Sequence, residues 1–156
     1  MTPQERAEAS ARSMYERDAA SQGLGMSIEA TSPGAATLFM TVTEAMTNGH
    51  KTCHGGFIFT LADSAFAFAC NSYNQNAVAQ MASITYLAPA YANDRLKAEA
   101  REIARVGRSG IYDVRVTNQA GTQIAEFRGH SRIIRGSHFT EPGESADETD
   151  PQTPTA

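Results

Sequence analysis

The sequence predicts an α+β domain in which an antiparallel sheet packs around one buried helix. Three observations lead to this fold class: a segment at 55–70 that is apolar nearly all round, an order of helix, two strands, helix and then further strands, and short polar turns between the strands. A helix that is apolar on every face is normally buried. One sheet can cover one side of it, so the other side needs a peripheral helix, the C-terminal tail or a second copy of the chain.

The first element is a peripheral helix expected at 3–21. Thr2 can cap this helix, Pro3 suits its first position, and Glu5 completes a capping box. Glycine at 23 ends the pattern.

The strands follow from alternating apolar residues and from turn residues between them. The stretch 46–54 is loop-like, with Asn48-Gly49 as a turn signal, and precedes the apolar helix. A change of phase at Glu102-Ile103 predicts a bulge. The expected strands are 26–31, 36–42, 78–87, 95–106, 111–118 and 122–134.

The 156 residues form one domain in three parts: an N-terminal helix at 1–22, the main domain at 23–136 and an acidic tail at 137–156. The net charge of −4 is uneven, because the tail holds five acids and no Lys or Arg. The remainder has 13 basic and 12 acidic residues, a net charge of +1. This balance argues against a nucleic-acid partner. The polar tail, which contains three prolines, is expected to be disordered.

Cellular context is predicted from what the sequence does not contain. The charged start lacks the apolar core of a secretory signal, and the run at 55–70 is too short for a membrane span. Two cysteines suggest neither a disulfide framework nor a metal site. We therefore expect a cytoplasmic protein with no metal and no membrane partner.

Asp63 is the strongest candidate for chemistry, because a carboxylate on an apolar helix loses hydration unless it is paired. Gly55 opens the same segment, and a glycine amide at a helix start can approach an anionic or carbonyl oxygen closely. Eight helical residues separate the two, about 12 Å at roughly 1.5 Å per residue. Catalytic contacts need roughly 3 Å. If both act on one substrate, they come from two chains, which predicts a two-fold dimer with composite sites.

Each candidate site residue could instead have a purely structural role. Asp63 could be satisfied by backbone amides, Gly55 could permit tight packing, Asn48 could be only a turn residue, and His54 could cap the helix. Cys53 precedes His54, but adjacency in sequence alone does not make a nucleophile–base pair.

The string from His54 to Asn71, together with 46–50 and 110–113, resembles the hotdog-fold thioesterases. The most similar subgroup is the phenylacetate-degradation thioesterase, and the similarity covers most of 3–135. The resemblance implies a hotdog fold, with the sheet wrapped around a long central helix, and dimers that pair into homotetramers. It also implies an enzyme that hydrolyses acyl-coenzyme A without a cofactor. Phenylacetyl-coenzyme A and its hydroxylated forms, in phenylacetate catabolism, are the implied substrates.

The resemblance also assigns roles to the candidate site residues. Asp63 would act as nucleophile or as base for water, and the Gly55 amide would polarise the thioester carbonyl. Asn48 and His54 would line the site, and Ser64 would supply a supporting hydroxyl.

Basic residues at 95–135 are candidates for binding the phosphates of coenzyme A, since this stretch contains nine Lys and Arg residues and only four acidic ones. Arg108, in the turn at 107–110, is the first choice. Two alternatives stay open: an acyl-thioester hydratase or dehydratase that uses His54 as a base, and a non-catalytic acyl-coenzyme A-binding protein.

Overall fold

The computed structural model describes residues 1–143. It contains a short 3₁₀ turn at Glu44–Met46 and nine longer elements within those residues. The helices are α1 (Pro3–Tyr15), α2 (Ala19–Gly23) and α3 (Gly55–Cys70). The strands are β1 (Ser27–Ser32), β2 (Ala35–Thr41), β3 (Ala77–Tyr86), β4 (Arg95–Val106), β5 (Ser109–Thr117) and β6 (Gln123–Ile133).

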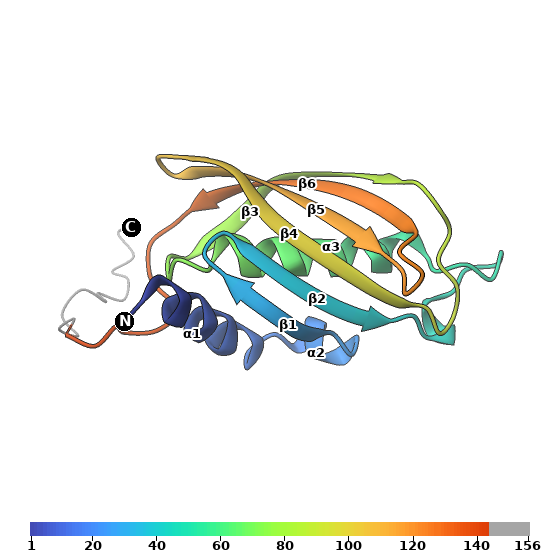
Figure 1. Cartoon of the computed structure of the whole chain (residues 1–156), viewed down its shortest axis with the longest axis horizontal. Coiled ribbons are helices and arrows are strands. Elements are labelled where there is room, and N and C mark those ends of the chain that lie inside the picture. Colours follow the sequence, from blue (N-terminus) through green and yellow to red (C-terminus); the bar gives the residue numbers. More distant parts are fainter. Residues whose placement is uncertain (144–156) are drawn as a thin grey trace, which may run out of the picture.

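The six strands form one antiparallel sheet in the order β1-β2-β4-β5-β6-β3, and α3 lies along its inner face (Figure 1). This confirms the α+β architecture around one central helix. Each strand lies within two residues of its expected range. The pairing of β4 with β5 shifts between Glu102 and Ala104, at the predicted bulge.

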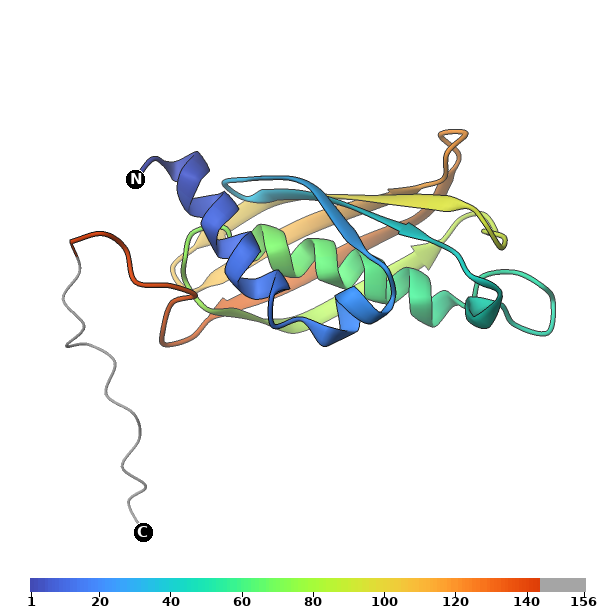
Figure 2. The ribbon, with the colours of Figure 1, turned by 90° about the horizontal axis from the view of Figure 1, so that it is seen from below.

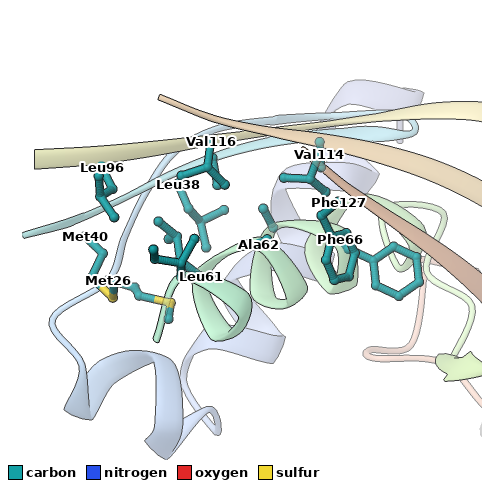
Figure 3. Close-up of a cluster of buried hydrophobic side chains, with 14 of the residues drawn as sticks. Met26, Leu38, Met40, Leu61, Ala62, Phe66, Leu96, Val114, Val116 and Phe127 are labelled. Atoms are coloured by element: carbon teal, nitrogen blue, oxygen red, sulfur yellow. The ribbon is translucent and has the colours of Figure 1, made fainter. Parts of the chain in front are cut away.

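The core lies between α3 and the sheet. Leu61 and Phe66 of α3 are buried against Leu38, Val114 and Phe127 of the strands (Figure 3). Burying a Leu or Phe side chain stabilises a fold by about 1.5–3 kcal/mol. This packing fixes how α3 is rotated, and therefore which of its residues stay off the sheet.

The prediction of one peripheral helix over 3–21 is wrong, because this stretch divides into α1 and α2. Thr2 and Glu5 form the expected capping box at the start of α1. The break comes because the Asp18 carboxylate accepts a hydrogen bond from the Ser21 amide at 2.9 Å and so caps a new helix. Both helices lie on the side of α3 away from the sheet, where much of α3 remains visible between and beyond them (Figure 2).

Residues 138–141 contact the domain, where the sequence predicted the start of a disordered tail. The His138 ring Nε2 lies 2.8 Å from Asn71 Oδ1, at the end of α3. The Ser13 hydroxyl of α1 donates to the His138 carbonyl at 2.8 Å, and Arg6 pairs with Glu141 through two hydrogen bonds. This stretch therefore ties α1 to the end of α3. The rest of the predicted tail, 144–156, lies outside the described residues.

Strand β3 forms one edge of the sheet, and within residues 1–143 no other strand pairs with its outer side. Val78 and Met81 on this strand are about half exposed, at 47% and 53%. A long, exposed, apolar edge strand is a template for pairing with another chain.

Candidate active site

Asp63 occupies the middle of α3 and is half-buried. Thr60 and Ala67, one turn before and one turn after it, are also half-buried, so this face of α3 is not fully covered by the described chain. No hydrogen bond reaches the Asp63 carboxylate from residues 1–143, and burial alone raises its pKa. The structural alternative, a carboxylate satisfied by backbone amides, is not observed within residues 1–143. A desolvated, unpaired carboxylate is suited to attack or to activate water.

At the start of α3, one amide has no acceptor within the described part of the chain. His54 is the N-cap, and its Nδ1 accepts a hydrogen bond from the Gly56 N–H at 2.9 Å. The Gly55 N–H donates to no group within residues 1–143 and belongs to the unsatisfied first turn of the helix. A free amide N–H at a helix start can donate a hydrogen bond to a developing oxyanion.

His54 therefore has the helix-capping role, and this limits its chemistry. Because Nδ1 accepts from Gly56, the neutral imidazole carries its proton on Nε2. The ring is left with an N–H that can donate and no free lone pair that can take a proton. This geometry suits a residue that orients a substrate better than a general base.

Asn48 organises the loop before α3. Its Oδ1 accepts from the His50 amide at 3.0 Å, the Thr52 amide at 3.3 Å and the Thr52 hydroxyl at 3.2 Å. Its side-chain NH₂ has no acceptor within residues 1–143, so it can still donate to a ligand. The expected turn role is confirmed, and the lining role stays a prediction.

Ser64 points to a neighbouring helix. Its hydroxyl lies 2.9 Å from the Ser21 hydroxyl of α2, which in turn donates to Asp18 at 2.6 Å. Since the Ser21 proton goes to Asp18, Ser64 donates its own proton to Ser21. The Ser64 hydroxyl therefore links α2 to α3, and its role in supporting Asp63 stays a prediction.

Arg108 lies far from the start of α3 in one protomer. Its turn joins β4 to β5 beyond the end of α3 (Figure 1), where the Arg105 guanidinium stacks 3.6 Å over the Tyr73 ring. Arg108 Nε donates to the Ile133 carbonyl at 3.1 Å. The structure thus brings His54, Gly55 and the Asn48 loop to one end of α3, with Asp63 at its middle and Arg108 at the other end.

Two hollows on the described surface lie elsewhere. One, of about 390 Å³, lies on the outer face of the sheet between Glu99 and Glu126. The other, of about 410 Å³, lies between α1 and β1. Neither is lined by Asp63 or Gly55.

Two features are absent from residues 1–143. No helix in this range is long and apolar enough to cross a bilayer. No group of three or more His, Cys, Asp or Glu side chains there is placed to hold a metal ion.

Comparison with known proteins places these residues in a family. The model of the thioesterase superfamily matches residues 50–125. Acyl-coenzyme A thioesterase PaaI of Escherichia coli is 45% identical over 127 residues, which cover 81% of this chain and 91% of that protein. The chain belongs to the thioesterase superfamily.

Solved structures agree with this thioesterase assignment and with the hotdog fold. The E. coli PaaI protein from the phenylacetic acid degradation operon aligns with a TM-score of 0.86 and 43% identity, covering 87% of this chain and 99% of that one. A Streptococcus mutans protein bound to acetyl-coenzyme A aligns with a TM-score of 0.69 and 26% identity, covering 72% and 90%.

One contact at the candidate site was not predicted from the sequence. The Tyr86 hydroxyl, at the end of β3, donates to the Gly55 carbonyl at 2.8 Å. No local pattern marks this pair, because 31 residues separate the two and their meeting depends on where β3 joins the sheet.

Proposed function

We propose that the protein is a thioester hydrolase that cleaves acyl-coenzyme A in sites shared between two subunits. The observation that carries the proposal is a pair of groups on one helix that have no hydrogen-bond partner within residues 1–143: the desolvated Asp63 carboxylate and the Gly55 amide. They stand about 12 Å apart along α3 at roughly 1.5 Å per residue, too far to act on one carbonyl. Two antiparallel α3 helices side by side bring Asp63 of one chain to Gly55 of the other.

The exposed edge of β3 supports a two-fold dimer of this kind. A partner strand there would satisfy the free backbone groups of β3 and cover Val78 and Met81, which are half exposed. The uncovered face of α3 would then meet its counterpart. Pairing of two dimers into a homotetramer is part of the proposal and rests on the family resemblance.

In the reaction, Asp63 takes a proton from a water that attacks the thioester carbon, or attacks that carbon itself and forms an acyl–Asp63 anhydride, which water then hydrolyses to release the free acid and restore the carboxylate. The carbonyl oxygen gains negative charge, which the Gly55 amide of the partner subunit stabilises. The carbon–sulfur bond then breaks, and the coenzyme A thiolate leaves and is protonated. Asn48 and His54 orient the acyl group or the water through their free N–H donors, and Arg108 contacts a phosphate of coenzyme A.

The acyl group is an aromatic one, such as phenylacetyl or hydroxyphenylacetyl, in a cytoplasmic pathway of phenylacetate breakdown. The support is the similarity to the E. coli PaaI protein of the phenylacetic acid degradation operon. The alternative of a hydratase or dehydratase is less well supported, because the Nδ1 lone pair of His54 already accepts from Gly56.

Thiol release from a panel of acyl-coenzyme A esters tests this proposal. We expect release that is fastest for phenylacetyl and hydroxyphenylacetyl esters and slower for acetyl. Asp63→Asn should lower kcat by about 10²–10⁴, the range for a catalytic acid or base. Glu99→Gln, at an exposed acid on the outer sheet face, is the matched control and should leave the rate unchanged. Equal turnover by Asp63→Asn would refute the catalytic role, and binding of an ester without thiol release would favour a non-catalytic protein.

A further inference from the structure

Tyr86 closes over the glycine that opens α3. Its hydroxyl donates to the Gly55 carbonyl at 2.8 Å, although the side chain is 49% exposed. A Cβ atom built on Gly55 would lie 2.8 Å from the Tyr86 ring Cζ and 2.9 Å from its hydroxyl oxygen. The end of the tyrosine ring therefore occupies the space that any side chain at position 55 would need.

The start of α3 needs such a restraint. Two successive glycines open the helix, and glycine has more backbone freedom than any other residue. An oxyanion donor is effective only when its direction is fixed before the reaction. Two contacts flank the free Gly55 N–H: the His54 amide donates to the Met46 carbonyl at 2.7 Å on one side, and Tyr86 binds the Gly55 carbonyl on the other.

We propose that Tyr86 is a positioning residue that fixes the direction of the Gly55 amide, and that glycine at position 55 leaves the space in which the Tyr86 ring makes this contact. The inference rests on the proposed thioesterase function and deepens it. Tyr86 acts here as a hydrogen-bond donor, and burial, followed by the nearby Cys53, raises the pKa of its hydroxyl. The donor proton is therefore retained at neutral and mildly alkaline pH.

Tyr91 offers a matched control on the same surface. It is exposed to a similar extent, at 53%, and its backbone forms a bridge with Thr52 in the loop before α3. Its hydroxyl has no hydrogen-bond partner within residues 1–143. Removing that hydroxyl changes the same surface and leaves the start of α3 untouched.

The test compares Tyr86→Phe with Tyr91→Phe. Tyr86→Phe keeps the ring and loses the hydroxyl, so kcat should fall about five- to tenfold, the effect of one lost hydrogen bond, while KM stays within about twofold. The thermal midpoint should stay within about 4 °C of the wild type. Tyr91→Phe should change none of these. An unchanged kcat in Tyr86→Phe, or an equal loss in Tyr91→Phe, would overturn the inference.

Gly55→Ala tests the coupling between the two residues. Its methyl group must push the Tyr86 ring aside, so it should break the same hydrogen bond while keeping the amide. The double variant Gly55→Ala/Tyr86→Phe should then lose no more activity than Gly55→Ala alone. Losses that multiply would show that the two residues act independently and would overturn the inference.

A measurement without turnover separates this inference from the proposed function. The ¹⁵N order parameter of Gly55 should be near ~0.85 in the wild type and fall towards ~0.6 in Tyr86→Phe. If the wild type releases thiol and neither the order parameter nor kcat responds to Tyr86→Phe, the positioning role fails and the thioesterase assignment stands. If the wild type releases no thiol from any ester, the thioesterase assignment fails. Tyr86 then has no catalytic role, even if the order parameter of Gly55 falls in Tyr86→Phe.

Discussion

A pair of complementary variants tests whether the site is shared between chains. Asp63→Asn removes the carboxylate charge while keeping its shape. Gly55→Pro removes the proposed oxyanion donor, since proline has no N–H. Proline suits this position because Gly55 is the first residue of α3. His54 before it has ψ 131°, within the range that a residue preceding proline adopts.

The expected magnitudes follow from the geometry. Alone, Gly55→Pro should lose about 10²–10³ in kcat, as for loss of one oxyanion donor. When the two variants exchange subunits at equal amounts, half of the dimers are mixed. Each mixed dimer has one site with both defects and one site with an intact Asp63 and an intact Gly55. The mixture should therefore recover about one quarter of wild-type activity from a two-fold dimer.

Thiol release from the mixture is the assay, and different affinity tags on the two variants allow the mixed dimer to be isolated. Gly55→Ala is the control for Gly55→Pro, because it keeps the N–H and brings the same Cβ against Tyr86. It should retain more activity than the proline variant. An isolated mixed dimer with no more activity than either parent would refute the shared site and place both functions within one chain.

Three further outcomes are expected. Burial raises the pKa of Asp63, so the folded chain holds this proton more tightly than the unfolded chain, and the stability of the wild type falls as pH rises through the folded pKa. Thermal melts should therefore show Asp63→Asn to be more stable than the wild type at neutral pH, by a margin that shrinks in acid. The acid limb of the pH–rate profile should disappear in the same variant. Leu61, which is 0% exposed, should cost about 2–5 kcal/mol of unfolding free energy in denaturant titrations when changed to Ala. Gly129→Ala places a Cβ 2.8 Å from the Phe66 ring and should cost about 1–3 kcal/mol in the same titration, and no loss would show that the ring can move freely.

Local patterns were enough to predict most of the fold. Strand positions follow from alternation, and the shift at Glu102 follows from a change of phase that the β4–β5 pairing confirms. The break between α1 and α2 was missed because the Ala-rich, charged pattern continues across it. The decisive contact is the Asp18 cap on Ser21, a residue whose hydroxyl also meets Ser64 of α3.

The candidate site was predictable to the extent that its residues are unusual for their element. An acid on an apolar helix and a glycine at its start stand out without any knowledge of the fold. Tyr86 does not stand out, since a tyrosine at a strand end is ordinary. Its role depends on β3 lying at the sheet edge beside the start of α3, after a return through the turn that follows Cys70. The contact of His138 with Asn71 was not predicted either, because the two residues are 67 positions apart and meet only in the folded chain.

The spacing of Asp63 and Gly55 along α3 has a consequence for how activity depends on the amount of protein. If the site is shared as proposed, one chain carries both halves of a site and cannot assemble one by itself. Below the dissociation constant of the dimer, specific activity would fall with dilution even though every chain remained folded. The abundance of the protein would then set both the number of sites and the fraction of chains able to form one, so turnover in a cell would rise more steeply than in proportion to expression.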